Sequence, residues 1–578
     1  MPGIVTRPES DRALTERALF LSRRLAVAVL LLARGLPVAA QDLGFEAVCE
    51  RLRSGDNAYF SDQLARRIEG DIEAGGHDAE TLAGLEGVLA RERLKLGAPE
   101  DAIALLDRAL DRVAALADPS PGLVASLEWH LALSWIQLAE DQNCIGHHNA
   151  ASCLLPISKE GVHTRPEAAR RAGDILAAYA EKHPRNVQAA WLLNLMRQVS
   201  GDWPDGVPPR LRLPDSAFAN SGSLPRWHDR GPELGLAAVD LAGGAVMDDF
   251  DGDGLLDLVA TTWDPCDHMK AWRNDGAGGF EDVTAAWGLG SQLGGLNLVQ
   301  GDVDGDGRLD LLVLRGAWML GEGRIRNSLL HNRIAAGSGF VDVTAAAGLA
   351  EPAYATGTAA WADYDGDGDL DVYIGNEATA AHDYPSQLFR NDGGGRFTDV
   401  AVAAGVTNDR YSKAVAWGDY DDDGDPDLYV SNFGENRLYR NDGGTFVDVA
   451  PQLGVTAPVR ESFPAWFFDF DNDGDLDLFV ADYRQQPAQV SGSYFGLRFD
   501  EGQPLLYRNE GGTFTEVSRE VGLARPLMPM GANYGDIDND GWLDVYLGTG
   551  EPDLASLMPN VMYRNRGGRF EDVTFVGG

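Results

Sequence analysis

Positive charge is scarce in this sequence. Its 578 residues include 48 lysines and arginines against 89 aspartates and glutamates, so the formal net charge is −41. A chain of that charge repels the phosphate backbone of nucleic acids and anionic membrane surfaces. We therefore expect no nucleic-acid partner, and the composition favours a protein that meets cations.

Cysteine is also scarce, with four residues at Cys49, Cys144, Cys153 and Cys266. Four cysteines are too few for a fold held mainly by disulfides. We favour a disulfide bridge between Cys144 and Cys153. There are two alternatives: both thiols are reduced, or both thiols and one imidazole of the adjacent histidine pair form a metal site. Cys49 and Cys266 fall in different predicted domains, and the sequence gives no pairing for them.

Long apolar runs are missing as well. The run Leu25–Ala33 follows an arginine pair and is broken by Arg34. It is too short for the roughly 20 residues of a bilayer span, so no membrane span is expected. Small residues at 38–40 suit a cleavage site, so residues 1–40 are predicted to be a signal peptide. The protein is then exported, to the periplasm, the extracellular space or the cell surface.

Residues 41–205 have the apolar spacing of α-helices. One face is formed by Ala102, Leu105, Leu106, Ala109, Leu110 and Val113, and Pro99 suits the first turn of that helix. Residues 123–138, 168–180 and 187–199 have similar spacing. Residues 97–110 and 184–203 resemble units of a tetratricopeptide repeat, with a generic helical bundle as the alternative. The segment 206–226 is rich in proline and serine, which predicts a linker.

Residues 227–578 change to short alternating strands separated by glycine turns, and one unit recurs along them. Each unit contains an acidic loop and, later, an R-N-x-G-G-x-F-x-D-V element. That element predicts a hairpin turn followed by a half-buried strand. Its copies span Arg273–Val283, His331–Val343, Arg390–Val400, Arg440–Val449, Arg508–Val517 and Arg564–Val573.

The acidic loop reads D-x-D-x-D-G-x-x-D, and its residues are numbered 1 to 9 below. Six copies occur, at 249–257, 302–310, 363–371, 419–427, 469–477 and 536–544. The candidate metal ligands are the aspartates at positions 1, 3, 5 and 9 and the carbonyl of position 7. These are Asp249, Asp251, Asp253, Leu255 and Asp257; Asp302, Asp304, Asp306, Arg308 and Asp310; Asp363, Asp365, Asp367, Asp369 and Asp371; Asp419, Asp421, Asp423, Asp425 and Asp427; Asp469, Asp471, Asp473, Asp475 and Asp477; and Asp536, Asp538, Asp540, Trp542 and Asp544.

Calcium is the ion that this loop fits. Ca²⁺ takes six to eight hard oxygen ligands, and glycine at position 6 permits the sharp turn that brings them together. None of the loops contains the cysteine or histidine that zinc and copper prefer. Mg²⁺ is possible but prefers rigid octahedral sites that retain water. We expect about six Ca²⁺ ions, one for each loop.

Two alternatives are less favourable. An EF-hand needs a glutamate at position 12 and flanking helices, whereas position 12 is apolar in every copy and the flanks alternate as strands do. A solvated acidic turn without an ion would explain one copy, but six intact copies disfavour it.

The repeats resemble the FG-GAP or VCBS repeat, the calcium-loop blade of β-propellers such as those of integrin α-subunits. With the helical region before it, the chain resembles bacterial relatives of the cartilage acidic protein family. The resemblance implies a multidomain α plus all-β fold, with four-stranded blades and the loop between two adjacent strands. Such propellers usually have seven blades, so either six form the ring or a seventh is missing or degenerate, and a truncated chain is one explanation.

Catalytic motifs are absent: neither G-x-S-x-G nor H-E-x-x-H occurs. Trp361 and Trp417 precede their loops by two residues and Trp466 precedes its loop by three, and this recurrence favours packing inside the blades over a sugar-stacking platform. The sequence therefore predicts a non-enzymatic binding, adhesion or scaffold module with a protein or glycan ligand. A propeller-type polysaccharide lyase or hydrolase is the alternative, because paired carboxylates could hide among the aspartates.

Overall fold

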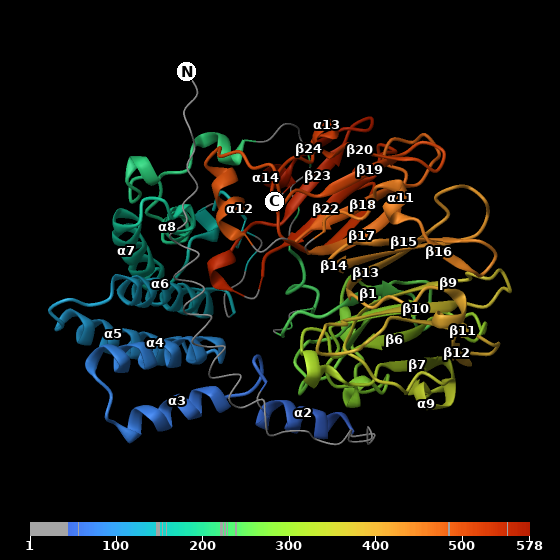
Figure 1. Cartoon of the computed structure of the whole chain (residues 1–578), viewed down its shortest axis with the longest axis horizontal. Coiled ribbons are helices and arrows are strands. Elements are labelled where there is room, and N and C mark those ends of the chain that lie inside the picture. The colour runs from blue at the N-terminus through green and yellow to red at the C-terminus, as the bar shows by residue number, and fades with distance from the viewer. Residues whose placement is uncertain are drawn as a thin grey trace. The chain divides into compact units, whose positions relative to one another are not determined.

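The computed structural model describes residues 44–577, except 56, 146–148, 150, 153, 158, 220–223, 225–226, 228, 237, 239, 460, 484–485 and 552 (Figure 1). The predicted signal peptide, Cys153 and the histidine pair after Cys144 thus lie outside the described residues. Within the described part of the chain, no helix combines the length and the hydropathy that a bilayer crossing needs.

The first region is helical, as predicted. Its helices are α2 (Phe45–Ser54), α3 (Gln63–Ala74), α4 (Ala79–Lys95), α5 (Pro99–Ala114), α6 (Pro121–Asn143), α7 (Glu167–Lys182) and α8 (Val187–Val199). Helix α5 begins at Pro99, whose missing N–H costs nothing in a first turn. Consecutive helices from α3 to α8 pack against one another. Three short 3₁₀ turns, η1 (Lys159–Gly161), η2 (Pro209–Leu211) and η3 (Asp215–Phe218), complete the region.

The helical core continues beyond the helices. Val207, Leu211 and Leu213 of the predicted linker are buried in it, so the first part of that segment is packed. The indole of Trp191 stacks on Tyr494 with 4.4 Å between ring centroids, and its Nε1–H donates to the carbonyl of Leu557 at 2.7 Å. The helical region and the last two repeats of the second region therefore share one core.

The second region is a β-propeller whose described strands form six four-stranded sheets, each antiparallel and built from consecutive strands. Blade 1 contains β1 (Ala245–Asp248), β2 (Asp257–Ala260), β3 (Lys270–Asn274) and β4 (Phe280–Asp282). Blade 2 contains β5 (Asn297–Gly301), β6 (Asp310–Leu314), β7 (Ser328–Arg333) and β8 (Gly339–Asp342). Blade 3 contains β9 (Thr356–Ala362), β10 (Asp371–Asn376), β11 (Gln387–Asn391) and β12 (Phe397–Asp399).

The other three blades repeat this order. Blade 4 contains β13 (Tyr411–Gly418), β14 (Asp427–Phe433), β15 (Arg437–Asn441) and β16 (Phe446–Asp448). Blade 5 contains β17 (Ser462–Phe468), β18 (Asp477–Asp482), β19 (Leu505–Asn509) and β20 (Phe514–Glu516), with helix α12 (Pro487–Tyr494) inserted. Blade 6 contains β21 (Pro529–Gly535), β22 (Asp544–Thr549), β23 (Val561–Asn565) and β24 (Phe570–Asp572), with the turn η7 (Leu554–Ser556) inserted.

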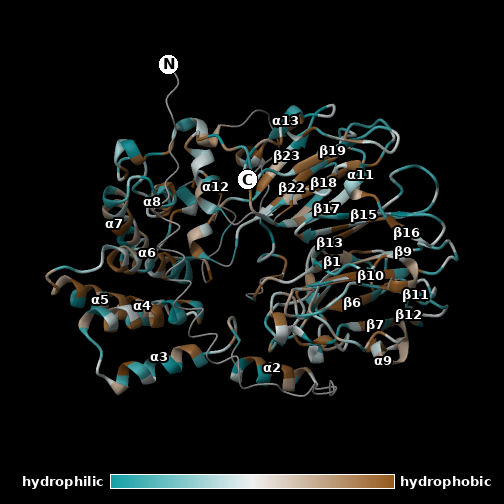
Figure 2. Cartoon of the chain, viewed as in Figure 1, coloured by the Kyte–Doolittle hydropathy of each residue, from teal (hydrophilic) through white to brown (hydrophobic). Residues whose placement is uncertain are grey.

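Short helical turns follow the fourth strands of five blades. They are α9 (Thr344–Ala347), α10 (Ala401–Ala404), α11 (Ala450–Leu453), α13 (Ser518–Val521) and α14 (Thr574–Gly577). Each acidic loop joins the first and second strands of its blade, which confirms the predicted placement and the rejection of an EF-hand. Figure 2 shows hydrophobic residues along strands such as β6, β10 and β18, as expected for sheets buried on both faces.

Apolar clusters join each blade to the next along the chain. The second residue after loop position 9 lies in these contacts. It is fully buried in blades 1 to 5, at Val259, Leu312, Tyr373, Tyr429 and Phe479. In blade 4, for example, the Tyr429 ring meets the edge of Phe467 from blade 5, with 6.3 Å between centroids.

The junction between the last and the first blade is different. Tyr546, the equivalent residue of blade 6, is 41% exposed. In blade 1, Met247 occupies the strand position that Trp361, Trp417 and Phe467 occupy in blades 3, 4 and 5. Those three side chains pack against the preceding blade, whereas Met247 is 52% exposed. Among the described residues, the packing that joins the other blades therefore does not close the ring, and the described strands form six blades whose first and last members each have an exposed face.

The helical region contacts both sides of this open junction. A disulfide joins Cys49 of α2 to Cys266 in blade 1, a pairing that the sequence left open. Helix α2 also packs Val48 and Leu52 against blade 2 residues, whereas Trp191 of α8 contacts the blade 6 segment around Leu557. The helices thus tie the first blades to the last one. The predicted bridge between Cys144 and Cys153 stays a prediction.

Candidate metal centres in the propeller loops

The backbone of each loop is folded around the carboxylate of position 1. In the loop of blade 4, Asp419 Oδ1 accepts from the N–H of Asp423 at 3.1 Å, and Oδ2 accepts from the N–H of Gly424 at 2.9 Å. Gly424 has φ of 96°, a left-handed conformation that glycine adopts without strain. The same two bonds occur in all six loops. Glycine at position 6 is therefore required by the backbone, as predicted.

The position 9 aspartates are buried and fixed. Asp427 Oδ2 accepts from the N–H of Tyr420 at 3.0 Å, and Oδ1 accepts from the N–H of Asn441 at 2.8 Å. Equivalent bonds hold the other five copies. Burial, with a further contribution from the aspartates at positions 3 and 5, raises the pKa of four of them to about 7: Asp310, Asp371, Asp427 and Asp477. Each loop thus contains one carboxyl group that needs a nearby positive charge to ionise easily.

The position 3 aspartates contain unsatisfied oxygens. The Oδ1 atoms of Asp304, Asp421, Asp471 and Asp538 are buried and lack a hydrogen-bond partner within the described structure. In each of the loops of blades 1 to 4, oxygens from three aspartates lie within 4.8 Å of one another. Converging carboxylates with a buried, unpartnered oxygen are what a hard cation compensates. The residues present therefore fit a Ca²⁺ ion, and the position 7 carbonyls stay predicted ligands.

Arginine residues distinguish the loops from one another. Arg333 and Arg508 donate to the position 3 carboxylates Asp304 and Asp471, each at 2.9 Å, and Arg564 is paired with Asp538. In blades 3 and 4 the equivalent arginines pair instead with an aspartate of the following turn. Three of the loops therefore already have a positive charge beside position 3.

The asparagine of five of the six R-N elements links neighbouring loops in the described structure, a role that the sequence analysis missed. Asn441 Nδ2 donates to the carbonyl of Tyr364, position 2 of the preceding blade's loop, at 2.8 Å. Four other blades make the same contact through Asn332, Asn391, Asn509 and Asn565. The recurrence of this asparagine was the available signal, but it was interpreted only as part of a hairpin turn. The candidate metal sites of blades 1 to 5 are thus each fixed by two blades.

A second candidate site lies where the first strands of the blades meet. Residues from all six blades line a cavity of about 690 Å³, including Trp318, Phe463, Trp466 and Tyr534. Among its described lining residues the ionisable ones are Lys413 and Tyr534. Trp361 and Trp417 pack against the blades before them, and Trp466 is buried against Phe479, which confirms the predicted role in blade packing.

The comparison with protein families agrees with this geometry. The model of the FG-GAP-like repeat matches residues 249–313, 363–430, 419–480 and 494–547, and every one of the six loops falls inside a matched segment. No curated protein matches the sequence significantly. Among solved structures, the Tc holotoxin pore of Photorhabdus luminescens matches at 18% identity with a TM-score of 0.31, over 61% of this chain and 16% of the toxin chain. The propeller of this chain is built from FG-GAP-like repeats.

Proposed function

We propose that this protein is an exported, calcium-loaded propeller that binds a protein or glycan ligand as an adhesion or scaffold module. The observation that carries the proposal is the buried, unpartnered position 3 oxygen beside converging carboxylates in the repeated loops. Calcium would neutralise these groups and stiffen the connection between the first two strands of each blade. Its role in this proposal is structural.

Two features support export. Extracellular calcium modules often bind Ca²⁺ with dissociation constants of about 10⁻⁴ to 10⁻³ M, which the extracellular medium can saturate and the cytosol cannot. The disulfide between Cys49 and Cys266 also belongs to oxidising compartments, because cytosolic reductants keep most thiols reduced.

The cavity between the first strands supports binding over hydrolysis. A glycoside hydrolase needs two carboxyl groups across the substrate, and a lyase needs a base in reach of it. The described lining offers Lys413 and Tyr534, and the Lys413 ammonium is already paired with Glu377 at 2.6 Å. Of the aromatic side chains in the lining, Tyr534 is 40% exposed and suits the stacking of a sugar ring or an aromatic side chain.

The helical region offers a second surface. Its consecutive packed helices support the proposal of tetratricopeptide-like hairpins, which would present a surface to a peptide. Their position before an FG-GAP-like propeller supports a relationship to bacterial members of the cartilage acidic protein family. A deletion of residues 41–205 is not a useful test, because Trp191 and its neighbours share a core with the last blades.

Thermal unfolding of the mature chain tests the calcium proposal. The melting temperature is expected to rise strongly from EDTA to Ca²⁺ and much less with Mg²⁺, and calorimetric titration should approach one ion per loop. The variant Asp421→Asn should lower the stoichiometry by one, while Asp442→Asn, in an exposed turn of the same blade, should leave it unchanged. An equal response to Mg²⁺, or no response, would overturn the proposal.

A further inference from the structure

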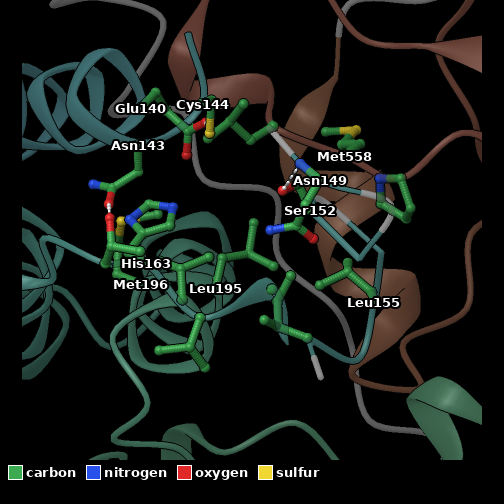
Figure 3. Close-up of a pocket in the computed structure, with 17 residues that line it drawn as sticks. Glu140, Asn143, Cys144, Asn149, Ser152, Leu155, His163, Leu195, Met196 and Met558 are labelled. Carbon is green, nitrogen blue, oxygen red and sulfur yellow. Dashed lines mark hydrogen bonds between the residues drawn. The ribbon is translucent and has the colours of Figure 1, made fainter. Parts of the chain in front are cut away.

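A second kind of metal-binding group lies in the helical region, away from the propeller loops. Glu140 and Cys144 are one turn apart at the end of α6, and His163 belongs to the segment between η1 and α7. One donor atom from each residue lies within 4.8 Å of the other two (Figure 3). All three side chains are half-buried.

Backbone contacts hold His163 opposite the end of α6. Asn143 Oδ1 accepts a hydrogen bond from the N–H of Arg165 at 2.8 Å, and Asn143 Nδ2 donates to the carbonyl of Arg165 at 3.0 Å. The N–H of His163 itself donates to the carbonyl of Val199 at 2.8 Å. These bonds join the segment to both α6 and α8, so the three donors meet through fixed elements.

The imidazole of His163 is poorly satisfied within the described structure. The Nδ1 atom of His163 is buried and has no hydrogen-bond partner within the described structure. The Cys144 thiol donates to Glu140 Oε2 at 3.0 Å. A buried imidazole nitrogen without a partner is costly, and it suits a lone pair that binds a metal.

We propose that Glu140, Cys144 and His163 bind a zinc ion. Zinc accepts thiolate, imidazole and carboxylate ligands, whereas Ca²⁺ binds oxygen alone, so this site is chemically distinct from the propeller loops. With Zn–S near 2.3 Å and Zn–N near 2.0 Å, tetrahedral donors lie about 3.5 Å apart. The three donor atoms already lie within 4.8 Å of one another, so zinc binding would need at most a modest approach of the side chains.

The proposed site opens onto a cavity. Its volume is about 150 Å³, and its walls include Leu155, Leu195, Met196 and Met558, the last from blade 6. Three protein ligands leave the fourth zinc position for a water molecule or a small donor in this cavity, as in zinc sites that are not closed. The apolar walls suit a ligand with one donor atom and a small hydrophobic body.

Cobalt substitution of the full mature chain tests the site. With the loops saturated by Ca²⁺, added Co²⁺ should give a near-ultraviolet thiolate-to-cobalt charge-transfer band. The band should persist in Cys153→Ser and disappear in Cys144→Ser. His163→Ala and Glu140→Gln should each weaken Co²⁺ binding about tenfold or more. His130→Ala, which removes a histidine that belongs to α6 itself, should change it less than about twofold.

Further readouts separate the site from a folding defect and from calcium binding. Zn²⁺ should protect Cys144 from alkylation in the parent chain and not in His163→Ala, while the Ca²⁺-dependent melting temperature stays unchanged in both. A charge-transfer band that survives Cys144→Ser, the absence of any band, or a Cys144–Cys153 bridge found by peptide mapping would each overturn the proposal.

Discussion

The Lys413 ammonium lies 2.6 Å from Glu377 Oε1, with both side chains buried between blades 3 and 4. The rings of Trp318, Tyr411, Phe433 and Phe463 surround that ammonium at 4.3 to 5.3 Å from their centroids. The second Glu377 oxygen accepts the N–H of Trp318 at 2.5 Å. Burial lowers the pKa of Lys413, and the carboxylate opposes this effect. One ion pair thus joins side chains from blades 2 to 5.

Glu377→Gln should destabilise the protein by about 3–5 kcal/mol, because it leaves a buried ammonium without a counter-charge. Adding Lys413→Met should recover most of that loss, since replacing both charges by groups of similar volume is often nearly neutral. Denaturant unfolding in saturating Ca²⁺ measures both effects. Glu181→Gln, which breaks the exposed pair with Arg210, is the control and should cost less than about 1 kcal/mol. A small loss in Glu377→Gln would contradict the buried pair.

The open ring predicts that equivalent tyrosines differ in their contribution to stability. Tyr429→Ala removes a fully buried ring between blades 4 and 5 and should cost about 3–5 kcal/mol. Tyr546→Ala removes the equivalent ring of blade 6, which is 41% exposed, and should cost about 1 kcal/mol or less. Both are measured by urea unfolding. Equal losses would mean that a further surface covers blade 6 in solution.

Local features of the sequence predicted most of the propeller. Loop, strand and turn follow one another within each repeat, so the spacing from Asp419 to Asp427 and the alternation after it are sufficient to place a blade. Contacts between distant segments were not predictable in this way. Cys49 and Cys266 are 217 residues apart, and their pairing depends on how α2 packs on blade 1. The approach of His163 to Cys144 likewise depends on the bonds of Asn143, which no periodicity encodes.

The metal-free protein should lose stability as the pH rises from about 4 to about 7. Burial raises the pKa of carboxyls such as Asp427 and Asp477 to about 7, so the folded chain retains protons that the unfolded chain has released. Because the folded state binds more protons in this range, stability falls as the pH increases. In EDTA the melting temperature should therefore be lower at about pH 7 than at about pH 5, and Asp427→Asn should reduce the difference. Saturating Ca²⁺ should reverse the trend, because the ion needs ionised carboxylates. A melting temperature in EDTA that rises with pH would contradict the prediction.

The arginines beside position 3 should weaken calcium binding in their own loops. Arg564 lies against Asp538 and, at 3.1 Å, Asp540, so a cation entering the loop of blade 6 must displace it or share its carboxylates. Arg564→Gln should raise the affinity of that loop several-fold, equivalent to about 1 kcal/mol for one partly exposed charge. Trp542 belongs to the same loop and provides a local readout, because an indole sensitises the luminescence of Tb³⁺ bound nearby. The luminescence that is lost in Trp542→Phe is the part of the signal that comes from this loop. Arg566→Gln removes the same charge from a pair with Glu571 outside the loop and should leave Tb³⁺ affinity nearly unchanged. If the two variants gain affinity equally, the effect is due to net charge and not to the contact between Arg564 and the loop.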